Sequence, residues 1–174
     1  MNVELPSGAL GAIAGRPVGQ IGIVVRDLDE ALERYGALWG AGPWSCWTMG
    51  PELVAEMGVD ESREPFSMRV ALAGEGPQLE LVESLTGPNI YEEWLAEHGE
   101  GLHHLGIHVP SIEAGMASMA AAGHRPRQWG RGYGAHGDGG FAYYDLRPVL
   151  GVYLELIEVP AERVPAERIC PAAP

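Results

Sequence analysis

Lysine is absent from this chain, and all 11 of its basic residues are arginines. Without lysine, the protein cannot form a Schiff base through a side-chain amine. The arginines are outnumbered by 24 acidic residues, which leaves a formal net charge of −13. Nucleic-acid affinity comes largely from neutralised phosphates, so we expect a chain this acidic to bind no nucleic acid.

Cysteines are scarce and long apolar runs are missing. Cys46 and Cys170 are too few and too far apart to indicate a zinc knuckle or a disulfide framework. No run approaches the ~20 apolar residues of a membrane helix. The N-terminal residues Met1–Pro6 lack the basic start of a secretory signal. We therefore expect a cytoplasmic protein in a reducing compartment, without a membrane partner.

The chain contains an internal repeat. Residues 101–109, GLHHLGIHV, align with residues 19–25, GQIGIVV, when His104 is placed on Gln20. Each copy leads into a helical pattern, and each half ends in a Leu-Glu-Leu strand, at 78–82 and 153–157. Because such self-similarity identifies a duplicated unit, we interpret the chain as two related halves.

Each half has the pattern of a strand, a helix and three further strands. Alternating apolar residues predict the strands, apolar residues at helical spacing predict the helices, and Asp27 and Ser111 are placed to cap them. The first half is expected to comprise a strand at 20–26, a helix at 28–39, strands at 44–49, 66–73 and 78–84, and a long loop at 50–65. The second half is expected to comprise a strand at 102–109, a helix at 112–122, and strands at 125–130, 141–146 and 151–159.

A chain of 174 residues is short enough for one domain or for two small modules that share a core. The expected division is an N-terminal arm at 1–18, a first module at 19–86, a linker helix at 87–100, a second module at 101–159 and a C-terminal tail at 160–174. The tail carries Val-Pro-Ala-Glu-Arg twice, and we expect it to be ordered only if something packs on it.

Four polar side chains occupy equivalent places in the two halves. Side chains alternate between the faces of a strand, so Gln20 faces away from the helix on which its apolar neighbours pack. By the same alternation His104 faces away from its helix, and Glu80 and Glu155 point away from the leucines that flank them. We therefore expect these four side chains to share the inner face of a curved sheet.

Two carboxylates, an imidazole and an amide oxygen together suit a divalent cation. The donor set fits Ni, Co, Zn, Mn or Fe(II), and an ion that prefers six ligands would keep positions for water or substrate. Taken singly, a strand histidine or glutamate is more often a core or surface residue than a ligand. Four polar groups at symmetric positions of a repeat favour the metal site, because burying them without a partner is costly.

These residues carry a resemblance to a known family. The repeat and the paired Leu-Glu-Leu motifs resemble those of the vicinal oxygen chelate (glyoxalase/bleomycin resistance/dioxygenase) superfamily over about residues 19–159. The segments most similar to methylmalonyl-CoA epimerases are 21–25, 78–82, 101–104, 134–137 and 151–155. The resemblance implies an α+β fold in which two paired βαβββ modules form a curved, cup-like mixed sheet around a metal.

The same resemblance implies the metal ligands and the chemistry. The family's metal positions correspond to Gln20, Glu80, His104 and Glu155. Epimerases usually have histidine where this chain has Gln20, whereas some glyoxalases use a similar Gln, Glu, His and Glu set. The metal would stabilise the enolate that forms when a proton leaves the carbon α to a carbonyl, with Glu155 as the base. An epimerase-like mechanism needs a second carboxylate, and Glu64 lies nearest to that position.

Substrate contacts are less defined by the sequence. The candidates are His108, Trp47, Trp129, Tyr143 and His136. His108 should face the cup beside His104, and the aromatic residues would line an apolar pocket. His136 lies in a glycine-rich loop that could close over that pocket. A strongly anionic substrate would need arginines, of which Arg125, Arg127 and Arg131 form the only dense cluster.

Three functions stay open. The first is a metal-dependent, epimerase-like isomerase or lyase. The second is a glyoxalase I-like lactoylglutathione lyase, which Gln20 favours and the lack of a basic glutathione-binding segment near the first strand disfavours. The third is a non-catalytic small-molecule binding or antibiotic-resistance protein. The expected partners are a small-molecule substrate and, because paired-module folds often complete their cup across an interface, a second copy in a homodimer.

Overall fold

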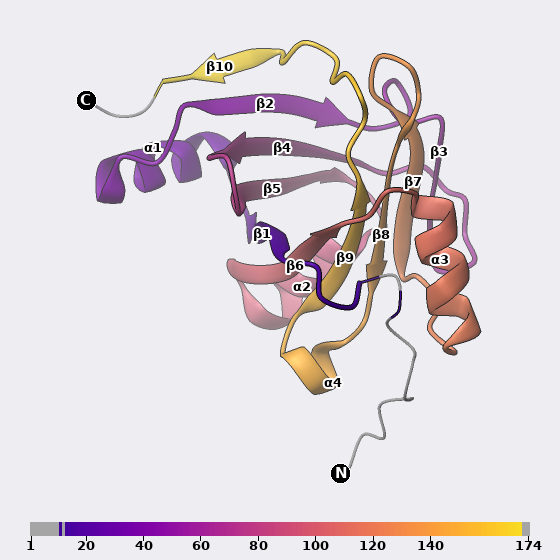
Figure 1. Ribbon diagram of the computed structural model, residues 1–174. Helices are drawn as coiled ribbons and strands as arrows, with labels where there is room; N and C mark the ends of the chain where they lie inside the picture. The colour runs from indigo at the N-terminus through magenta and orange to yellow at the C-terminus, as the bar shows by residue number, and fades with distance from the viewer. Residues whose placement is uncertain (1–10, 12, 172–174) are drawn as a thin grey trace.

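The computed structural model describes residue 11 and residues 13–171 of the chain. The predicted N-terminal arm lies mostly outside the described residues, as do the last three residues of the predicted tail. Within the described part, ten strands form one mixed, curled sheet, and the helices Leu28–Trp39 and Ile112–Ala121 pack on its outer side (Figure 1). The predicted α+β fold class is therefore confirmed, whereas the exact limits of the two modules remain a prediction.

The helices and strands follow the predicted order with a few additions. The first half comprises β1 (Val18–Val25), α1 (Leu28–Trp39), β2 (Trp44–Met49), β3 (Glu56–Val59), β4 (Ser67–Ala73) and β5 (Gln78–Thr86). Helix α2 (Ile90–His98) connects the halves. The second half comprises β6 (Gly101–His108), α3 (Ile112–Ala121), β7 (Gln128–Tyr133), β8 (Gly139–Tyr144), α4 (Arg147–Leu150) and β9 (Tyr153–Glu158), followed by β10 (Arg168–Cys170).

The first strands of the two repeats meet at the centre of the sheet. The strand order is β10-β2-β4-β5-β1-β6-β9-β8-β7-β3, with β1 and β6 antiparallel to each other. On its other side, β1 has β5 as a parallel partner, and β6 has β9. The two Leu-Glu-Leu strands therefore flank the two repeat starts, which brings all four equivalent polar positions to the middle of the curl.

Helix α1 begins and ends where its sequence indicates. The Asp27 side chain accepts a hydrogen bond from the backbone N–H of Glu30, which satisfies a donor that the helix itself leaves free. Gly40 ends the helix with φ of 68°, a conformation that glycine adopts at low cost. Leu28 and Ala31 are fully buried and pack against the outer side of the sheet.

The loop predicted at 50–65 contains an additional strand, so that prediction was wrong in part. Strand β3 lies in this segment and pairs antiparallel with β7, with Met57 opposite Gly130. The first half thus contributes the edge strand of the second half. Local patterning did not indicate β3, because its four residues contain a glutamate and a glycine and pair with a strand that is distant in the sequence.

The predicted tail is a structural part of the sheet. Strand β10 pairs antiparallel with β2, with Ile169 opposite Ser45. Figure 1 shows the chain leaving β9, crossing the open side of the curl and returning along β2. The segment was expected to be ordered only if something packed on it. In the structure it pairs with β2 and packs against the core on the concave side.

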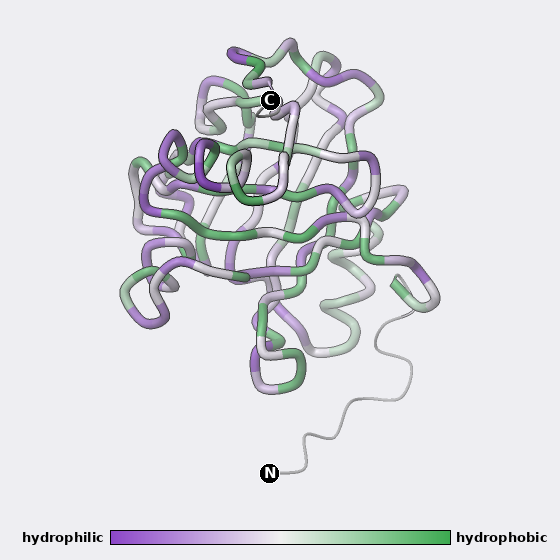
Figure 2. The backbone as a smooth tube through the Cα atoms, turned by 90° about the vertical axis from the view of Figure 1, so that its left-hand side faces the viewer, coloured by the Kyte–Doolittle hydropathy of each residue, from purple (hydrophilic) through white to green (hydrophobic). Residues whose placement is uncertain are grey.

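The core divides between the two faces of the sheet. One cluster fills the concave side and includes Val24, Val82 and Tyr143, while two outer clusters lie beneath α1 and α3. Hydrophobic stretches run along the strands, and hydrophilic stretches gather in the peripheral turns (Figure 2). Among the described residues, no helix has the length and apolar character needed to cross a membrane.

Candidate metal and catalytic site

Three of the four predicted ligands converge on the concave side of the sheet. Glu80 of β5, His104 of β6 and Glu155 of β9 are all buried, and their ligand atoms lie within 4.8 Å of one another. The Nε2 atom of His104 lies 3.0 Å from Oε2 of Glu80 and 3.3 Å from Oε2 of Glu155. The alternation of side chains along the strands is what brings them together.

The same three atoms have no hydrogen-bond partner. Neither contact of His104 Nε2 has the angles of a hydrogen bond, so this nitrogen and the Oε2 atoms of Glu80 and Glu155 are buried and unsatisfied. Burying such groups without a partner is costly, and a cation among them would remove that cost. Two carboxylate oxygens and one imidazole nitrogen form a donor set that suits a divalent transition metal. The residues present therefore fit the metal that the family resemblance implies.

Glycine makes room for the imidazole. Gly22 lies opposite His104 in the β1–β6 ladder, and a Cβ atom there would overlap the His104 ring. Any larger residue at position 22 would displace the histidine from the site. Gly106 gives similar room to Gln20, since a Cβ at Gly106 would lie 2.9 Å from that of Gln20.

Gln20, the fourth predicted ligand, is buried on the wall of the same cavity as Glu80 and Glu155. Its side-chain amide is therefore available on the side of the sheet where the other three ligands meet. Its role as a ligand stays a prediction.

Burial and charge interactions shift the pKa values of His104 and Glu155. Burial alone lowers the pKa of His104, but the charge of Glu155 and the close approach of both carboxylates outweigh it and raise the pKa to about 9. Burial raises the pKa of Glu155, although the nearby His104 opposes this shift. A carboxylate that binds a proton more readily than usual is suited to act as a base.

His103, which was not among the predicted site residues, is fully buried beside the site. Alternation would place His103 on the opposite face from His104, but a β-bulge after Gly22 breaks the register and turns both rings inward. The Nδ1 atoms of the two histidines lie 3.0 Å apart. The His103 ring also stacks on Tyr153, at 4.8 Å between centroids. Only the pairing of β6 with β1 reveals this bulge.

The tautomers of the histidine pair follow from their surroundings. The pKa of His104 is raised to about 9, so without a metal both ring nitrogens carry a proton at neutral pH, and with a metal on Nε2 the remaining proton is on Nδ1. That proton is donated to Nδ1 of His103. Burial lowers the pKa of His103 well below its ordinary value, so His103 is the neutral acceptor. His103 thereby fixes the orientation of the imidazole in the site.

An apolar cavity opens above these side chains. Apolar side chains make up most of its lining and a few polar groups converge on it, as in small-molecule sites. Its polar lining consists of Gln20, Glu80, Glu155, Tyr91, Tyr133, Tyr143 and Arg163. Its apolar lining includes Trp47, Met49, Met68, Val70, Leu72, Phe141, Ile157 and Val164. Trp47 and Tyr143, two predicted substrate contacts, therefore lie on the cavity wall.

Glu64 and Trp129 do not lie on that wall, which corrects two expectations. Glu64 is exposed, and its backbone N–H donates to Ser62 Oγ. Strand β3 draws this part of the loop toward β7 and away from the cavity. Trp129 faces the outer side of the sheet with the cluster beneath α3, and the Arg131 guanidinium lies 5.2 Å from its ring centroid.

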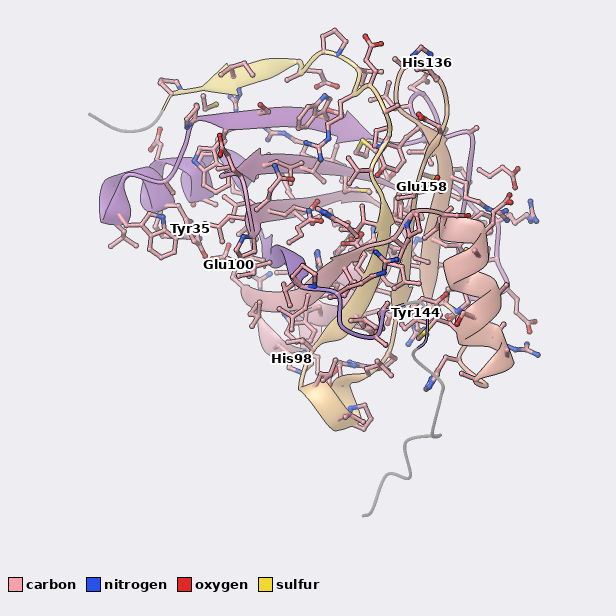
Figure 3. All side chains as sticks on the ribbon, viewed as in Figure 1. Tyr35, His98, Glu100, His136, Tyr144 and Glu158 are labelled. Carbon is pink, nitrogen blue, oxygen red and sulfur yellow. The ribbon has the colours of Figure 1, made fainter. Side chains whose placement is uncertain are left out.

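The histidines predicted to contact substrate also lie outside the cavity lining. His108 has the same strand parity as His104, but β6 ends there, so the side chain is exposed and its ring rests against Gly19. His136 lies in the β7–β8 loop, where Figure 3 places it at the outer end of the sheet. Its Nε2 is 3.4 Å from a carboxylate oxygen of Glu162.

The dense arginine cluster is engaged elsewhere. Arg127 binds Asp60 at 2.6 Å and Glu93 at 3.0 Å. Arg125 and Arg131 each lie 3.6 Å from a glutamate oxygen. None of the three lines the cavity.

Comparisons with known proteins agree with the fold. No curated protein sequence matches the chain significantly. A methylmalonyl-CoA epimerase solved with methylmalonyl-CoA and ammonium is similar, with a TM-score of 0.58 and 24% identity over 86% of this chain and 99% of that one. A serine-to-threonine variant of the Streptomyces coelicolor epimerase, solved with 2-nitronate-propionyl-CoA, gives a TM-score of 0.59 at 24% identity and the same coverages.

The epimerase of Mycobacterium tuberculosis gives a TM-score of 0.53 at 20% identity, over 81% of this chain and 87% of that one. Identities this low establish a shared fold. The family model of the glyoxalase/bleomycin resistance protein/dioxygenase superfamily matches residues 19–144, which is well over half of the chain. The protein with this buried Glu, His and Glu group therefore belongs to the glyoxalase/bleomycin resistance protein/dioxygenase superfamily.

Proposed function

We propose that the protein is a divalent-metal-dependent isomerase or lyase that transfers a proton at the carbon α to a carbonyl. One observation carries this proposal: three buried, unpartnered ligand atoms of Glu80, His104 and Glu155 meet at an apolar cavity. Those three residues, with Gln20 as the proposed fourth ligand, would hold the metal. A bound divalent cation would polarise the carbonyl oxygen and so make the neighbouring C–H more acidic.

Glu155 is the proposed base. It is 4% exposed and lines the cavity, and burial raises its pKa, so it can accept a proton from a carbon held above it. Tyr143 packs edge-on against His104, at 5.1 Å between ring centroids, and its hydroxyl accepts a hydrogen bond from Tyr91. These rings and the aliphatic wall exclude water, which strengthens the electrostatic interactions inside the cavity.

A glyoxalase-like reaction is the second candidate, and the position of Glu64 favours it. A two-base epimerisation needs a second proton carrier on the opposite face of the carbon. Glu64 is exposed outside the cavity, and the only other carboxylate in the described cavity lining is the proposed ligand Glu80. An isomerisation in which Glu155 removes a proton and returns it to the adjacent carbon needs no second base.

The test is exchange of the α-hydrogen in heavy water, followed by proton NMR. The protein loaded with Co, Ni or Zn would be given methylmalonyl-CoA, 4-oxo-4-phenylbutanoate, and the hemithioacetal of methylglyoxal and glutathione. We expect exchange or isomerisation of at least one compound, and about a 10³-fold loss in Glu155→Gln. The matched control is Glu113→Gln, whose carboxylate is exposed on α3.

Elemental analysis accompanies each variant, because Glu155 is also a proposed ligand. Turnover of none of the three compounds by the metal-loaded protein, with tight binding of one, would support the non-catalytic alternative. A homodimer and a cytoplasmic location also remain proposals, and light scattering tests the first of them.

A further inference from the structure

The C-terminal segment at 160–167, here called the strap, is attached to the second half at its first end. The backbone N–H of Ala135 donates to the carbonyl of Glu162 at 2.8 Å, and the N–H of Ala161 donates to Asp138 Oδ2 at 3.0 Å. Pro160 is buried against Gly134, where a Cβ atom would collide with the proline ring. The strap thus begins as a fixed continuation of β9.

Its other end is attached to the first half. The Glu167 carboxylate accepts hydrogen bonds from the backbone N–H and the hydroxyl of Thr48, both at 3.0 Å. The N–H of Glu167 donates to the carbonyl of Cys46 at 3.0 Å, and β10 then continues along β2. The strap therefore bridges the two halves across the open side of the cup, as Figure 1 shows.

The middle of the strap forms part of the cavity. Val164 and Arg163 both line it, and the Val164 carbonyl accepts a hydrogen bond from Trp47 Nε1 at 3.0 Å. Val164 and Ala166 pack against the core cluster on the concave side. The strap is therefore a wall opposite the proposed metal ligands and has a defined conformation.

Arg163 gives this wall a charge. Among the described residues that line the cavity, it is the only basic one and the only exposed one, which places it at the mouth. Its guanidinium has one long hydrogen bond, 3.4 Å to Gln78 Oε1, and no carboxylate among the described residues forms an ion pair with it. A divalent cation would neutralise Glu80 and Glu155, so one positive charge would remain free to face a ligand.

We propose that the strap makes the site selective for compact carbonyl compounds with an apolar body and a single carboxylate, which Arg163 binds at the mouth. The part of this proposal that places the carbonyl at the metal rests on the proposed function. The binding of the carboxylate by Arg163 does not depend on it. A coenzyme A thioester carries several phosphate charges, and the clustered Arg125, Arg127 and Arg131 lie outside the cavity in their own ion pairs. The site therefore disfavours such polyanions.

Calorimetric titration of the Co-loaded full chain tests this proposal. The probes are 4-oxo-4-phenylbutanoate, its homologue 5-oxo-5-phenylpentanoate, the methyl esters of both, and propionyl-CoA. We expect one of the acids to bind more tightly than its neutral ester and more tightly than propionyl-CoA. In Arg163→Gln the affinity for that acid should fall about 10-fold, whereas the affinity for the ester should change less than about 2-fold.

Arg125→Gln is the matched control, because it removes the same charge from an exposed arginine outside the cavity. Thermal unfolding checks that each variant folds. The proposal is overturned if Arg163→Gln weakens acid and ester equally, if propionyl-CoA binds more tightly than both acids, or if neither acid binds. Because binding needs no turnover, acid-selective binding by a metal-loaded protein that neither exchanges nor isomerises any of the three test compounds would overturn the proposed function and leave the inference standing.

Discussion

The floor and the strap of the cavity have different origins in the sequence. The floor comes from strands β1, β5, β6 and β9, which belong to the repeat, and its proposed metal ligands occupy equivalent positions in the two halves. The strap lies beyond the repeat and has no counterpart in the first half. We infer that the duplicated part supplies a chemistry that many relatives can share, and that the added part determines which molecule this protein accepts.

The largest expected effect comes from filling the space beneath the imidazole. In Gly22→Ala, the added methyl group would overlap the His104 ring, so the ring must leave the site. We expect cobalt affinity to fall more than about 100-fold and unfolding free energy to fall by about 2 kcal/mol or more, because overpacking strains a rigid core. Gly76→Ala is the control, since a Cβ there meets nothing within 4 Å. Unchanged cobalt absorption in Gly22→Ala would show that His104 is not a ligand.

The stability of the metal-free protein should also depend on pH, because His104 on the cavity floor titrates. The pKa of His104 is raised from 6.5 to about 9, so its folded form gains a proton more readily than its unfolded form. This contribution to stability is complete below pH 6.5 and is lost as the pH rises toward 9. We expect the melting temperature of the metal-free protein to fall over that range. The same titration of His104→Gln should show a smaller fall, and an identical fall would contradict the assignment.

The next effect concerns His103, which contacts the proposed ligand His104. His103→Phe keeps the ring stacked on Tyr153 but removes the acceptor for the His104 Nδ1–H. We expect cobalt affinity to fall about 10-fold, whereas His103→Asn should restore part of it if its amide oxygen reaches His104. Long-range ¹H–¹⁵N NMR of the wild-type protein should show His103 protonated at Nε2. His136→Phe, in the β7–β8 loop, should leave the metal affinity unchanged.

The smallest expected effect comes from a change in the strap, which should alter stability and substrate affinity but not the metal affinity of the floor. Glu167→Ala removes two hydrogen bonds to Thr48, and we expect it to lower the unfolding free energy by about 1 kcal/mol. Substrate affinity should weaken a few-fold, because the wall that carries Arg163 loses one attachment, while cobalt affinity stays unchanged. Glu162→Ala is the control, since its carboxylate is exposed beside His136. Loss of cobalt affinity in Glu167→Ala would show that the floor depends on the strap.

The sequence predicted those parts of the structure that depend on local periodicity. Alternation within the repeated strands placed Glu80, His104 and Glu155 together, and Asp27 marked the start of α1. Contacts between distant segments were not predictable in the same way. The bulge that turns His103 inward depends on how β6 pairs with β1, and β3 exists only through its pairing with β7.

The remaining errors have related causes. Glu64 was assigned to the site by its place in a loop, and pairing within that loop directs it elsewhere. Trp129 was assigned by residue type, although strand parity alone leaves open which face is the concave one. The strap was treated as a tail because prolines and charged residues obscure any period, yet polar anchors such as Glu167 hold it in place.

Strand β10 has a further consequence for how the molecule behaves at high concentration. Without it, β2 would become the edge of the sheet and present unpaired backbone groups to other chains. Exposed strand edges of this kind promote intermolecular pairing and aggregation. The C-terminal segment that lines the cavity therefore also shields the rim, so proteolytic removal of β10 is expected to reduce solubility.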